Sequence, residues 1–333
     1  MFQNKYYISK SRFLNILALA LLIVFLVSAA LFFISKWEKK QGAYEGSSTE
    51  TLSQTLRYNG KEYILKENVE TYLFLGLDKF DAEKPESYNN DKQADFLMLI
   101  VVDNKDSSFT ALHINRDTMA EMNILGVAGE KIGTAKKQIA LAHTYGNGRE
   151  VSCRNTANAV SKLLLNAEIN HYVSVTMDAV PIYNDLLGGV EVTVLDDFTG
   201  IDDTLVKDEK ITLLGQHALN YVRTRYGLDD STNVHRMKRQ RQYLKALHEK
   251  TVKCYEDEPA FIGQSVLKLT DYIVSDCSVN KLQTFAEKVS SYKFNEICTL
   301  DGENVTGERF MEFHPDEESV MSTAIKLFYK LQD

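Results

Sequence analysis

The longest apolar segment of the chain lies close to its N-terminus. Within residues 13–34, the only polar side chains are Asn15 and Ser28. A helix needs about 20 apolar residues to cross the hydrocarbon core of a bilayer, whereas the apolar region of a cleaved signal peptide has roughly 7–15. We therefore expect this segment to form an uncleaved transmembrane helix, with residues 1–12 as a cytoplasmic tail.

Beyond residue 55, short β-rich runs alternate with segments of helical periodicity, which is typical of layered α/β folds. Strands are expected at Tyr72–Leu77, Phe96–Val102, Phe109–Ile114, Tyr172–Thr176 and Val190–Leu195, with edge strands near Ile297 and at Phe310–Phe313. Helices are expected at Thr134–Tyr145, Thr156–Leu165, Ala179–Leu187, Gly215–Val222, Val234–Tyr255, Phe261–Val274 and Val279–Tyr292.

A polar stretch at residues 35–55 separates the apolar segment from this alternating region. Its content of Ser, Thr, Gly and Glu predicts a solvated linker. Nothing in the sequence marks a second linker, and the chain has only four prolines. We therefore expect residues 56–333 to form one domain, which is large enough for a substantial core.

The charges beside the apolar segment favour one orientation only weakly. Lys5, Lys10 and Arg12 precede it, but three lysines also follow it closely. Because basic residues tend to remain cytoplasmic, the first group favours a cytoplasmic N-terminus and an extracellular domain at the cell membrane.

The chain as a whole is acidic, with a formal net charge of −8. An acidic domain repels nucleic acid and anionic lipid headgroups, so any anion that it binds must meet a local basic pocket. The four cysteines include no CxxC pair, and their spacing does not indicate a zinc site. Three disulfide pairings remain open, although we favour buried free thiols for Cys153, Cys254, Cys277 and Cys298.

Two acids stand at the ends of predicted strands. Asp78 ends the run Leu75–Leu77, and Asp95 opens the next apolar strand. Ligands bind at strand ends in α/β sheets, and Mg²⁺ takes one or two carboxylates together with phosphate oxygens. Together the two acids suggest a divalent metal site, although each alone is more simply a turn or capping residue.

Arginines supply the second group of candidate residues. Arg116 either presents its planar fork to a phosphate or forms a local ion pair with Asp117. Arg223 and Arg225 are two residues apart, so in an extended segment they face the same way and need an anionic partner. On the following helix, residues spaced by three or four share one face. That face carries Arg236, Arg239, Gln240 and Tyr243.

Familiar nucleophile motifs are absent from the sequence. It contains no G-x-S-x-G, no H-E-x-x-H and no P-loop. His143 is more simply a core or capping histidine than a catalytic one.

Six segments, in this order, resemble the LytR–CpsA–Psr family of bacterial cell-wall proteins. They span most of residues 70–245, and the N-terminal anchor also fits that family. The segments are Phe74–Asp78, Ala94–Asp95, Asn115–Thr118, Leu187–Val192, Gly215–Arg225 and Arg236–Gln240.

The resemblance implies an α-β-α sandwich with a central mixed sheet and an apolar groove for a polyprenyl tail. It implies that arginines clamp the phosphates while aspartates hold Mg²⁺ or Mn²⁺. Carried over to this chain, Asp78 and Asp95 match the metal-associated aspartates. The phosphate-clamping arginines correspond to Arg116, Arg223, Arg225 and Arg236, and Gln240 matches a polar residue one turn after the last of them.

The implied reaction is phosphoryl-type transfer. A peptidoglycan hydroxyl attacks the pyrophosphate that joins a glycopolymer, such as teichoic acid or capsule-like polysaccharide, to its lipid carrier. Asp95, Arg116, Arg223 and Arg225 are the implied catalytic residues. Because this chemistry depends on positioning and charge neutralisation, it needs no protein nucleophile.

The chain departs from the family pattern at two places. Gln93-Ala94 stands where many members have Arg-Ser, and Lys79-Phe80 stands where many have an arginine. Neither Lys nor Gln replaces a bidentate arginine, although Lys79 restores a point charge near the phosphate. The alternative function is therefore a non-catalytic or hydrolytic binder of polyprenyl (pyro)phosphate. A membrane-tethered transcription regulator fits least, because the domain is acidic and is expected outside the cell.

Overall fold

A computed structural model describes residues 52–80, 92–225, 233–308 and 310–332. The predicted cytoplasmic tail, the predicted membrane helix and most of the predicted linker lie outside these residues. Within the described ranges, no helix is long and apolar enough to cross a membrane.

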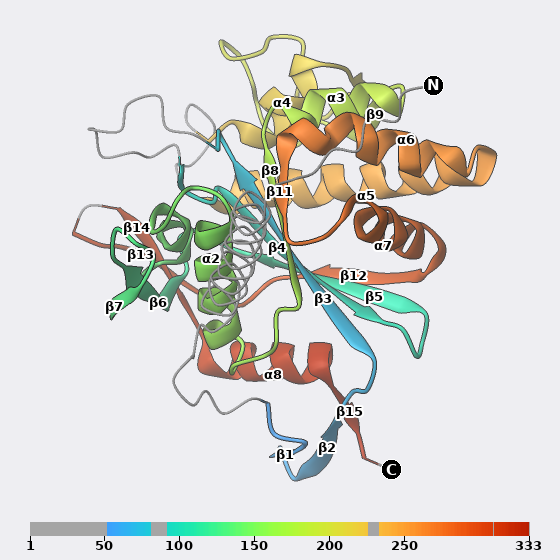
Figure 1. The fold of residues 1–333 in the computed structure, drawn as a ribbon. Helices are drawn as coiled ribbons and strands as arrows, with labels where there is room; N and C mark the ends of the chain where they lie inside the picture. Colours follow the sequence, from blue (N-terminus) through green and yellow to red (C-terminus); the bar gives the residue numbers. More distant parts are fainter. Residues whose placement is uncertain (1–51, 81–91, 226–232, 309, 333) are drawn as a thin grey trace, which may run out of the picture. The chain divides into compact units, whose positions relative to one another are not determined.

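A six-stranded mixed sheet forms the centre of the fold, as predicted (Figure 1). β3 pairs antiparallel with β4 and parallel with β8, and β12 pairs parallel with β5 at one edge. In spatial order the strands are β11 (Ile273–Ser275), β8 (His171–Thr176), β3 (Val69–Leu77), β4 (Phe96–Asp103), β5 (Ser108–Ile114) and β12 (Lys293–Cys298).

Helices cover both faces of this sheet, which explains why its central strands are almost wholly apolar. Successive side chains of a strand point to opposite faces. Leu73, Leu75 and Leu77 accordingly join the main core with α2 (Glu150–Leu163) and α8 (Glu317–Phe328). Tyr72 and Phe74 instead contact Phe285 of α7 (Val279–Ser291) on the opposite face (Figure 1).

A second apolar cluster holds the helices that carry the arginines. It is built around Phe198 and Tyr221, whose rings stack with their centroids 5.7 Å apart. The cluster includes Tyr221 and Val222, the two residues of α4 directly before its last residue, Arg223. Its elements are α3 (Ala179–Leu186), β9 (Val190–Thr193), β10 (Lys210–Leu213), α4 (Gln216–Arg223) and α5 (Asn233–Asp257).

Two helix predictions need correction. Residues 134–145 do not form a helix, because their first part belongs to β7 (Lys131–Gln138), which pairs with β6 (Met119–Leu125). Only the short 3-10 helix η2 (Ile139–Thr144) follows, and it carries the apolar residues that mimicked a helical stripe. The helix predicted to reach Val274 is α6 (Ala260–Leu269), and the turn η3 (Thr270–Tyr272) then leads into β11.

The remaining elements form small sheets beside the core. The edge strand predicted near Ile297 is β12, whereas the one predicted at residues 310–313 lies in a separate hairpin. That hairpin pairs β13 (Gly302–Thr306) with β14 (Met311–Pro315). A three-stranded sheet contains β1 (Thr55–Tyr58), β2 (Lys61–Leu65) and β15 (Tyr329–Leu331).

Candidate functional site

The strand register brings the two candidate aspartates to the same end of the sheet. Gly76 of β3 lies opposite Phe96 of β4, and the Asp95 N–H donates to the Gly76 carbonyl at 2.8 Å. A Cβ at Gly76 would lie 2.8 Å from the Phe96 Cβ, so glycine permits this close pairing. Asp78 follows two residues after Gly76 and therefore leaves the sheet beside Asp95.

Arg116 follows β5, which pairs with β4, and its side chain contacts Asp95 at this end of the sheet. Its guanidinium donates hydrogen bonds to the Asp95 carboxylate and to the Gln93 side-chain oxygen. Its Nε lies farther from its sequence neighbour, 3.6 Å from Asp117 Oδ1. The local ion pair with Asp117, one of the two roles considered for Arg116, is therefore secondary to the ion pair with Asp95.

Gln93, one of the departures from the family pattern, is a partner of Arg116. Gln93 is buried, and its amide oxygen accepts a hydrogen bond from the Arg116 guanidinium. An arginine at position 93 would put a second cation in this place. Compared with family members that have an arginine at this position, the chain therefore has a hydrogen-bond acceptor that orients Arg116 in place of a cation.

Asp117 organises the same region, although the sequence pointed to it only as an ion-pair partner. It is buried and accepts a hydrogen bond from Gln138 Nε2 at 3.0 Å, and Arg225 lies 3.7 Å from its other oxygen. Burial raises the pKa of the Asp117 carboxyl, and the nearby arginines only partly offset that rise. The carboxylate thus links Arg116 and Arg225 in a largely desolvated place.

Arg236 is a buried cation whose hydrogen bonds go to neutral oxygens. Its Nε donates to Asn233 Oδ1 at 2.8 Å, and one terminal nitrogen donates to the Asp95 carbonyl at 3.4 Å. Burial lowers the pKa of Arg236 to about 9, and repulsion from Arg116 and Arg225 adds to that effect. A bound anion would relieve this electrostatic cost.

Arg223 and Arg225 reach different acids. Arg223 is the last residue of α4, and its guanidinium lies 3.0 Å from Asp78 Oδ1. The extended segment predicted for both residues begins only after Arg223. Arg225 turns to Asp117 instead, so the pair bridges two acids at one end of the sheet.

Arg239, which the sequence placed on the same helix face, has a structural role. Its side chain is 1% exposed and donates to the carbonyls of Tyr221 and Thr224 and to the Asp196 carboxylate. Thr224 lies between Arg223 and Arg225. Arg239 therefore fixes the backbone that presents those two residues.

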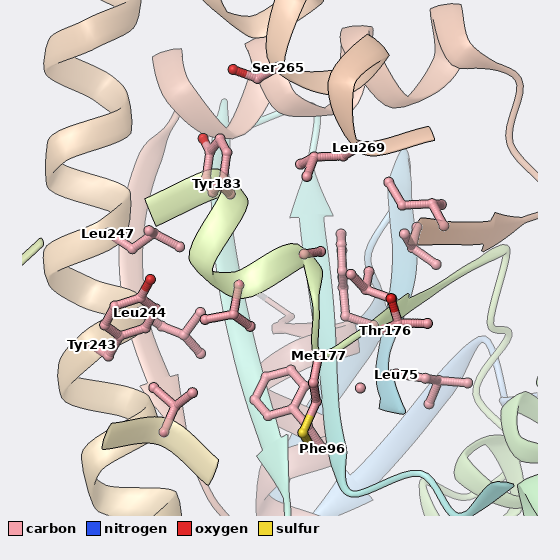
Figure 2. A pocket seen from close by; sticks show the side chains of 18 of the residues that line it. Leu75, Phe96, Thr176, Met177, Tyr183, Tyr243, Leu244, Leu247, Ser265 and Leu269 are labelled. Carbon is pink, nitrogen blue, oxygen red and sulfur yellow. The ribbon is translucent and has the colours of Figure 1, made fainter. Parts of the chain in front are cut away.

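An apolar cavity of about 400 Å³ begins beside this cluster. It lies between the sheet face and the helices α3, α4, α5, α6 and α7, and Figure 2 shows 18 of the side chains that line it. Arg223 and Gln240 line it, whereas Arg116, Arg225 and Arg236 do not. The Gln240 amide donates to the Val222 carbonyl at 3.0 Å, so this residue is held at the cavity wall.

The aspartates fit the oxygen chemistry of a magnesium site. Asp78 Oδ1 is buried and has no hydrogen-bond partner among the described residues, although Arg223 contacts it at 3.0 Å. Two carboxylates at adjacent strand ends, near cations that attract phosphate, match the donors that Mg²⁺ prefers. Lys79 follows Asp78 at the same strand end and is exposed.

His143 is a core histidine, as expected. Its Nδ1 lies 2.8 Å from the Lys92 carbonyl, and burial lowers its pKa to about 4. All four cysteines are free thiols, but only Cys153 is fully buried. The expectation of buried thiols therefore holds for one cysteine of the four.

Sequence comparison relates the chain to cell-wall transferases. The model of the LytR_cpsA_psr family matches residues 30–327. One relative, 29% identical over 203 residues, is the polyisoprenyl-teichoic acid–peptidoglycan teichoic acid transferase TagU of Enterococcus faecalis. A TagU of Bacillus cereus is 31% identical over 188 residues. The matches cover 60% and 56% of this chain and 60% and 54% of those relatives.

Solved structures share the fold at low sequence identity. TagV of B. subtilis matches with a TM-score of 0.61 and 22% identity, over 79% of this chain and 97% of that one. A structure of TagT bound to LI-WTA matches with a TM-score of 0.59 and 20% identity, over 85% and 98%. These likenesses establish the fold.

Proposed function

Because this chain belongs to the LytR–CpsA–Psr family, we propose that it transfers a glycopolymer from a polyprenyl-pyrophosphate carrier to a hydroxyl of peptidoglycan. Similarity to TagU proteins, which are named as teichoic acid transferases, supports this reaction class and favours a teichoic acid as the glycopolymer.

The observation that carries the proposal is the junction of two unlike environments at Arg223 and Gln240. On one side lies the apolar cavity, and on the other lies the cluster of arginines and aspartates. A polyprenyl pyrophosphate has the same two parts. Its tail would occupy the cavity while its pyrophosphate meets Arg116, Arg223, Arg225 and Arg236.

The chemistry is a displacement at phosphorus. The acceptor hydroxyl attacks the glycan-side phosphorus, a new P–O bond forms, and the P–O bond to the bridging oxygen breaks. Polyprenyl monophosphate leaves with that oxygen, and Asp95 is the candidate to accept the hydroxyl proton. The guanidiniums neutralise charge that spreads over the phosphate oxygens, which is the main contribution expected of a protein in such transfers.

Asp78 and Asp95 would hold Mg²⁺ or Mn²⁺, which would supply further positive charge to the phosphate oxygens. Metal binding at Asp95 competes with its role as proton acceptor. Lys79 adds a point charge at the same strand end.

The membrane helix proposed at residues 13–34 would serve the same reaction. A substrate with a polyprenyl tail stays in the bilayer, so a tethered extracellular domain meets it in two dimensions. This arrangement belongs to a Gram-positive-type envelope and leaves nucleic acid out of reach.

The proposal is tested with the double variant Arg223→Ala/Arg225→Ala in the full-length chain. We expect transfer of glycopolymer to peptidoglycan to fall about 100-fold or more while the circular dichroism spectrum is unchanged. The matched control is Lys238→Ala/Lys245→Ala, which removes two exposed lysines of α5. Wild-type transfer by the arginine double variant would overturn the proposal.

The alternative, hydrolysis or binding without transfer, is separated by the products. Water as acceptor releases the glycan phosphate into solution, whereas a binder produces no polyprenyl monophosphate. The Gln93–Arg116 contact motivates this comparison, since Gln93 is one of the residues that depart from the family pattern.

A further inference from the structure

A second group of ligand-type side chains lies at the opposite end of β8 from the arginine cluster. His171 is the first residue of β8, and Thr176, which lines the cavity, is the last. These two residues are five positions apart along the strand, a separation of about 17 Å. The antiparallel pairing of β8 with β11 aligns Ser275 with Val173. Continued by two residues, the same register sets Cys277 opposite His171.

Three different donors converge there. Ligand atoms of His171, Asp276 and Cys277 all lie within 4.8 Å of one another. His171 Nδ1 lies 3.6 Å from Asp276 Oδ1, which in turn lies 3.7 Å from Cys277 Sγ. Tetrahedral zinc, with bonds of about 2.0–2.1 Å to nitrogen and oxygen and about 2.3 Å to sulfur, sets its ligand atoms about 3.3–3.6 Å apart. The side chains thus already stand close to zinc-binding separations.

One ring nitrogen of His171 faces Asp276, and the other lies near the Glu70 carboxylate at ion-pair rather than hydrogen-bond distance. Its Nδ1 is buried and has no hydrogen-bond partner within the described part of the chain. Its other nitrogen, Nε2, lies 3.7 Å from Glu70 Oε1. A carboxylate behind a histidine favours the proton on that far nitrogen and leaves the near nitrogen free to bind metal. Lys281 and Lys288 pair with Glu70, which balances its charge.

The turn that carries the other two ligands is already ordered against β8. Asp276 Oδ1 accepts a hydrogen bond from the Tyr172 N–H at 3.1 Å. Ser275 Oγ donates to the Tyr172 carbonyl at 2.6 Å and accepts from the Cys277 N–H at 3.0 Å. Little ordering is therefore needed before an ion binds.

We propose that His171, Asp276 and Cys277 bind one Zn²⁺ ion, with water in the fourth position. The carboxylate and the thiolate balance the charge of the ion. Nitrogen and thiolate donors select a borderline ion over Mg²⁺, which prefers oxygen. Asp276 is partly exposed, and His171 also lines an open polar hollow, so the ion has a route from solvent.

Binding is coupled to loss of a proton from Cys277. Zinc binds the thiolate form of cysteine, so the Cys277 thiol releases one proton to solvent as the sulfur bonds to the metal. The ion would tie the turn before α7 to β8. Since Leu282 and Phe285 of α7 line the apolar cavity, the site would fix one wall of that cavity.

Cysteine spacing alone did not indicate this site, because its ligands come from distant segments of the chain. It is independent of the proposed transferase function, and its test needs no glycopolymer. The test uses the full-length chain in detergent, reduced and stripped of metal, and titrated with Co²⁺ as a spectroscopic probe.

We expect one equivalent of Co²⁺ to give a thiolate-to-cobalt charge-transfer band and the visible bands of a tetrahedral ion. One equivalent of Zn²⁺ should abolish them, and excess Mg²⁺ should not. Cys277→Ser should abolish the charge-transfer band. His171→Gln and Asp276→Asn should weaken binding by about tenfold or more. Cys254→Ser, which replaces another half-buried thiol, is the matched control and should retain the spectrum.

Absence of the charge-transfer band in the wild-type chain, or its persistence in Cys277→Ser, would overturn the proposal. Circular dichroism of each variant establishes that it is folded. If Cys277→Ser did not fold, the proposal would still be tested by the charge-transfer band of the wild-type chain and by weaker Co²⁺ binding in His171→Gln.

Discussion

The side-chain oxygen of Gln93 accepts a hydrogen bond from the guanidinium of Arg116. Gln93 is buried and the Arg116 side chain is largely buried, and Arg116 also pairs with Asp95. Glutamine therefore stands at the position where many family members are expected to have a second arginine, and it helps to hold Arg116 in a fixed orientation.

Gln93→Arg should destabilise the chain when no anion is bound. It removes the acceptor of Arg116 and adds a buried cation, which costs about 1–3 kcal/mol. Inorganic pyrophosphate should then raise the Tm of this variant more than it raises the Tm of the wild type. Thermal unfolding with and without pyrophosphate measures both effects. Gln216→Arg, at an exposed site, is the control, and equal responses of the two variants would contradict the account.

Arg236→Met should separate stability from activity. The depressed pKa of Arg236 means that its charged form costs stability at neutral pH. In the wild type this cost begins to fall only as the pH rises above about 9, because the folded chain then gives up a proton that the unfolded chain keeps. An apolar residue of similar length removes the cost, which offsets the lost hydrogen bonds to Asn233 and Asp95.

We therefore expect the free energy of unfolding of Arg236→Met to stay within about 1 kcal/mol of the wild type at neutral pH. Transfer should fall about 100-fold because a phosphate contact is lost. Denaturant unfolding and the transfer assay measure the two quantities. Strong destabilisation together with normal transfer would show that Arg236 is only structural.

Asp117→Asn should stabilise the chain at neutral pH and impair transfer. Since the pKa of Asp117 is raised in the folded state, its ionised form costs stability above that pKa. The gain in the variant should be greatest at neutral pH and should vanish as the pH falls below the usual carboxyl value. Denaturant unfolding across that pH range measures it.

Transfer by Asp117→Asn should fall about tenfold, because Arg116 and Arg225 lose the charge that positions them. Asp197→Asn, which replaces an aspartate away from this network, is the control. A stability gain that grows toward low pH would contradict the assigned sign.

Leu244→Trp should block the cavity without harming the arginine cluster. Leu244 lies on the cavity wall contributed by α5, where Figure 2 labels it. The added volume should reduce transfer from a long polyprenyl carrier at least about tenfold, since a filled pocket no longer accepts the tail. Binding of inorganic pyrophosphate, measured by calorimetry, should not change.

The control for the cavity is Leu214→Trp, because that leucine is exposed. Full transfer by Leu244→Trp would mean that the polyprenyl tail lies elsewhere.

The sequence predicted β4 and β5 to within one residue because both strands are apolar on both faces. For β3 it found only the apolar part from Tyr72 onward, because the strand begins three residues earlier with Val69, Glu70 and Thr71. It failed at residues 134–145, where an apolar group in η2 follows a half-exposed strand and imitates helical periodicity. Neither β6 nor β7 was predicted as a strand, so their pairing could not be predicted either.

At the candidate site, family motifs identified the aspartates and arginines but not their contacts. The Arg116–Gln93 and Arg225–Asp117 contacts depend on strand register and on where α4 ends. The proposed zinc ligands had no sequence signal, because His171 and Cys277 meet only through the pairing of β8 with β11.

We propose above that the chain moves a glycopolymer phosphate from its lipid carrier to peptidoglycan. The most direct measurement incubates the purified full-length chain with a polyprenyl-pyrophosphate-linked teichoic acid, peptidoglycan and Mg²⁺, and quantifies both products. We expect polyprenyl monophosphate and peptidoglycan-bound glycan phosphate in equal amounts. Monophosphate without glycan on the peptidoglycan, or no monophosphate at all, would contradict the claim.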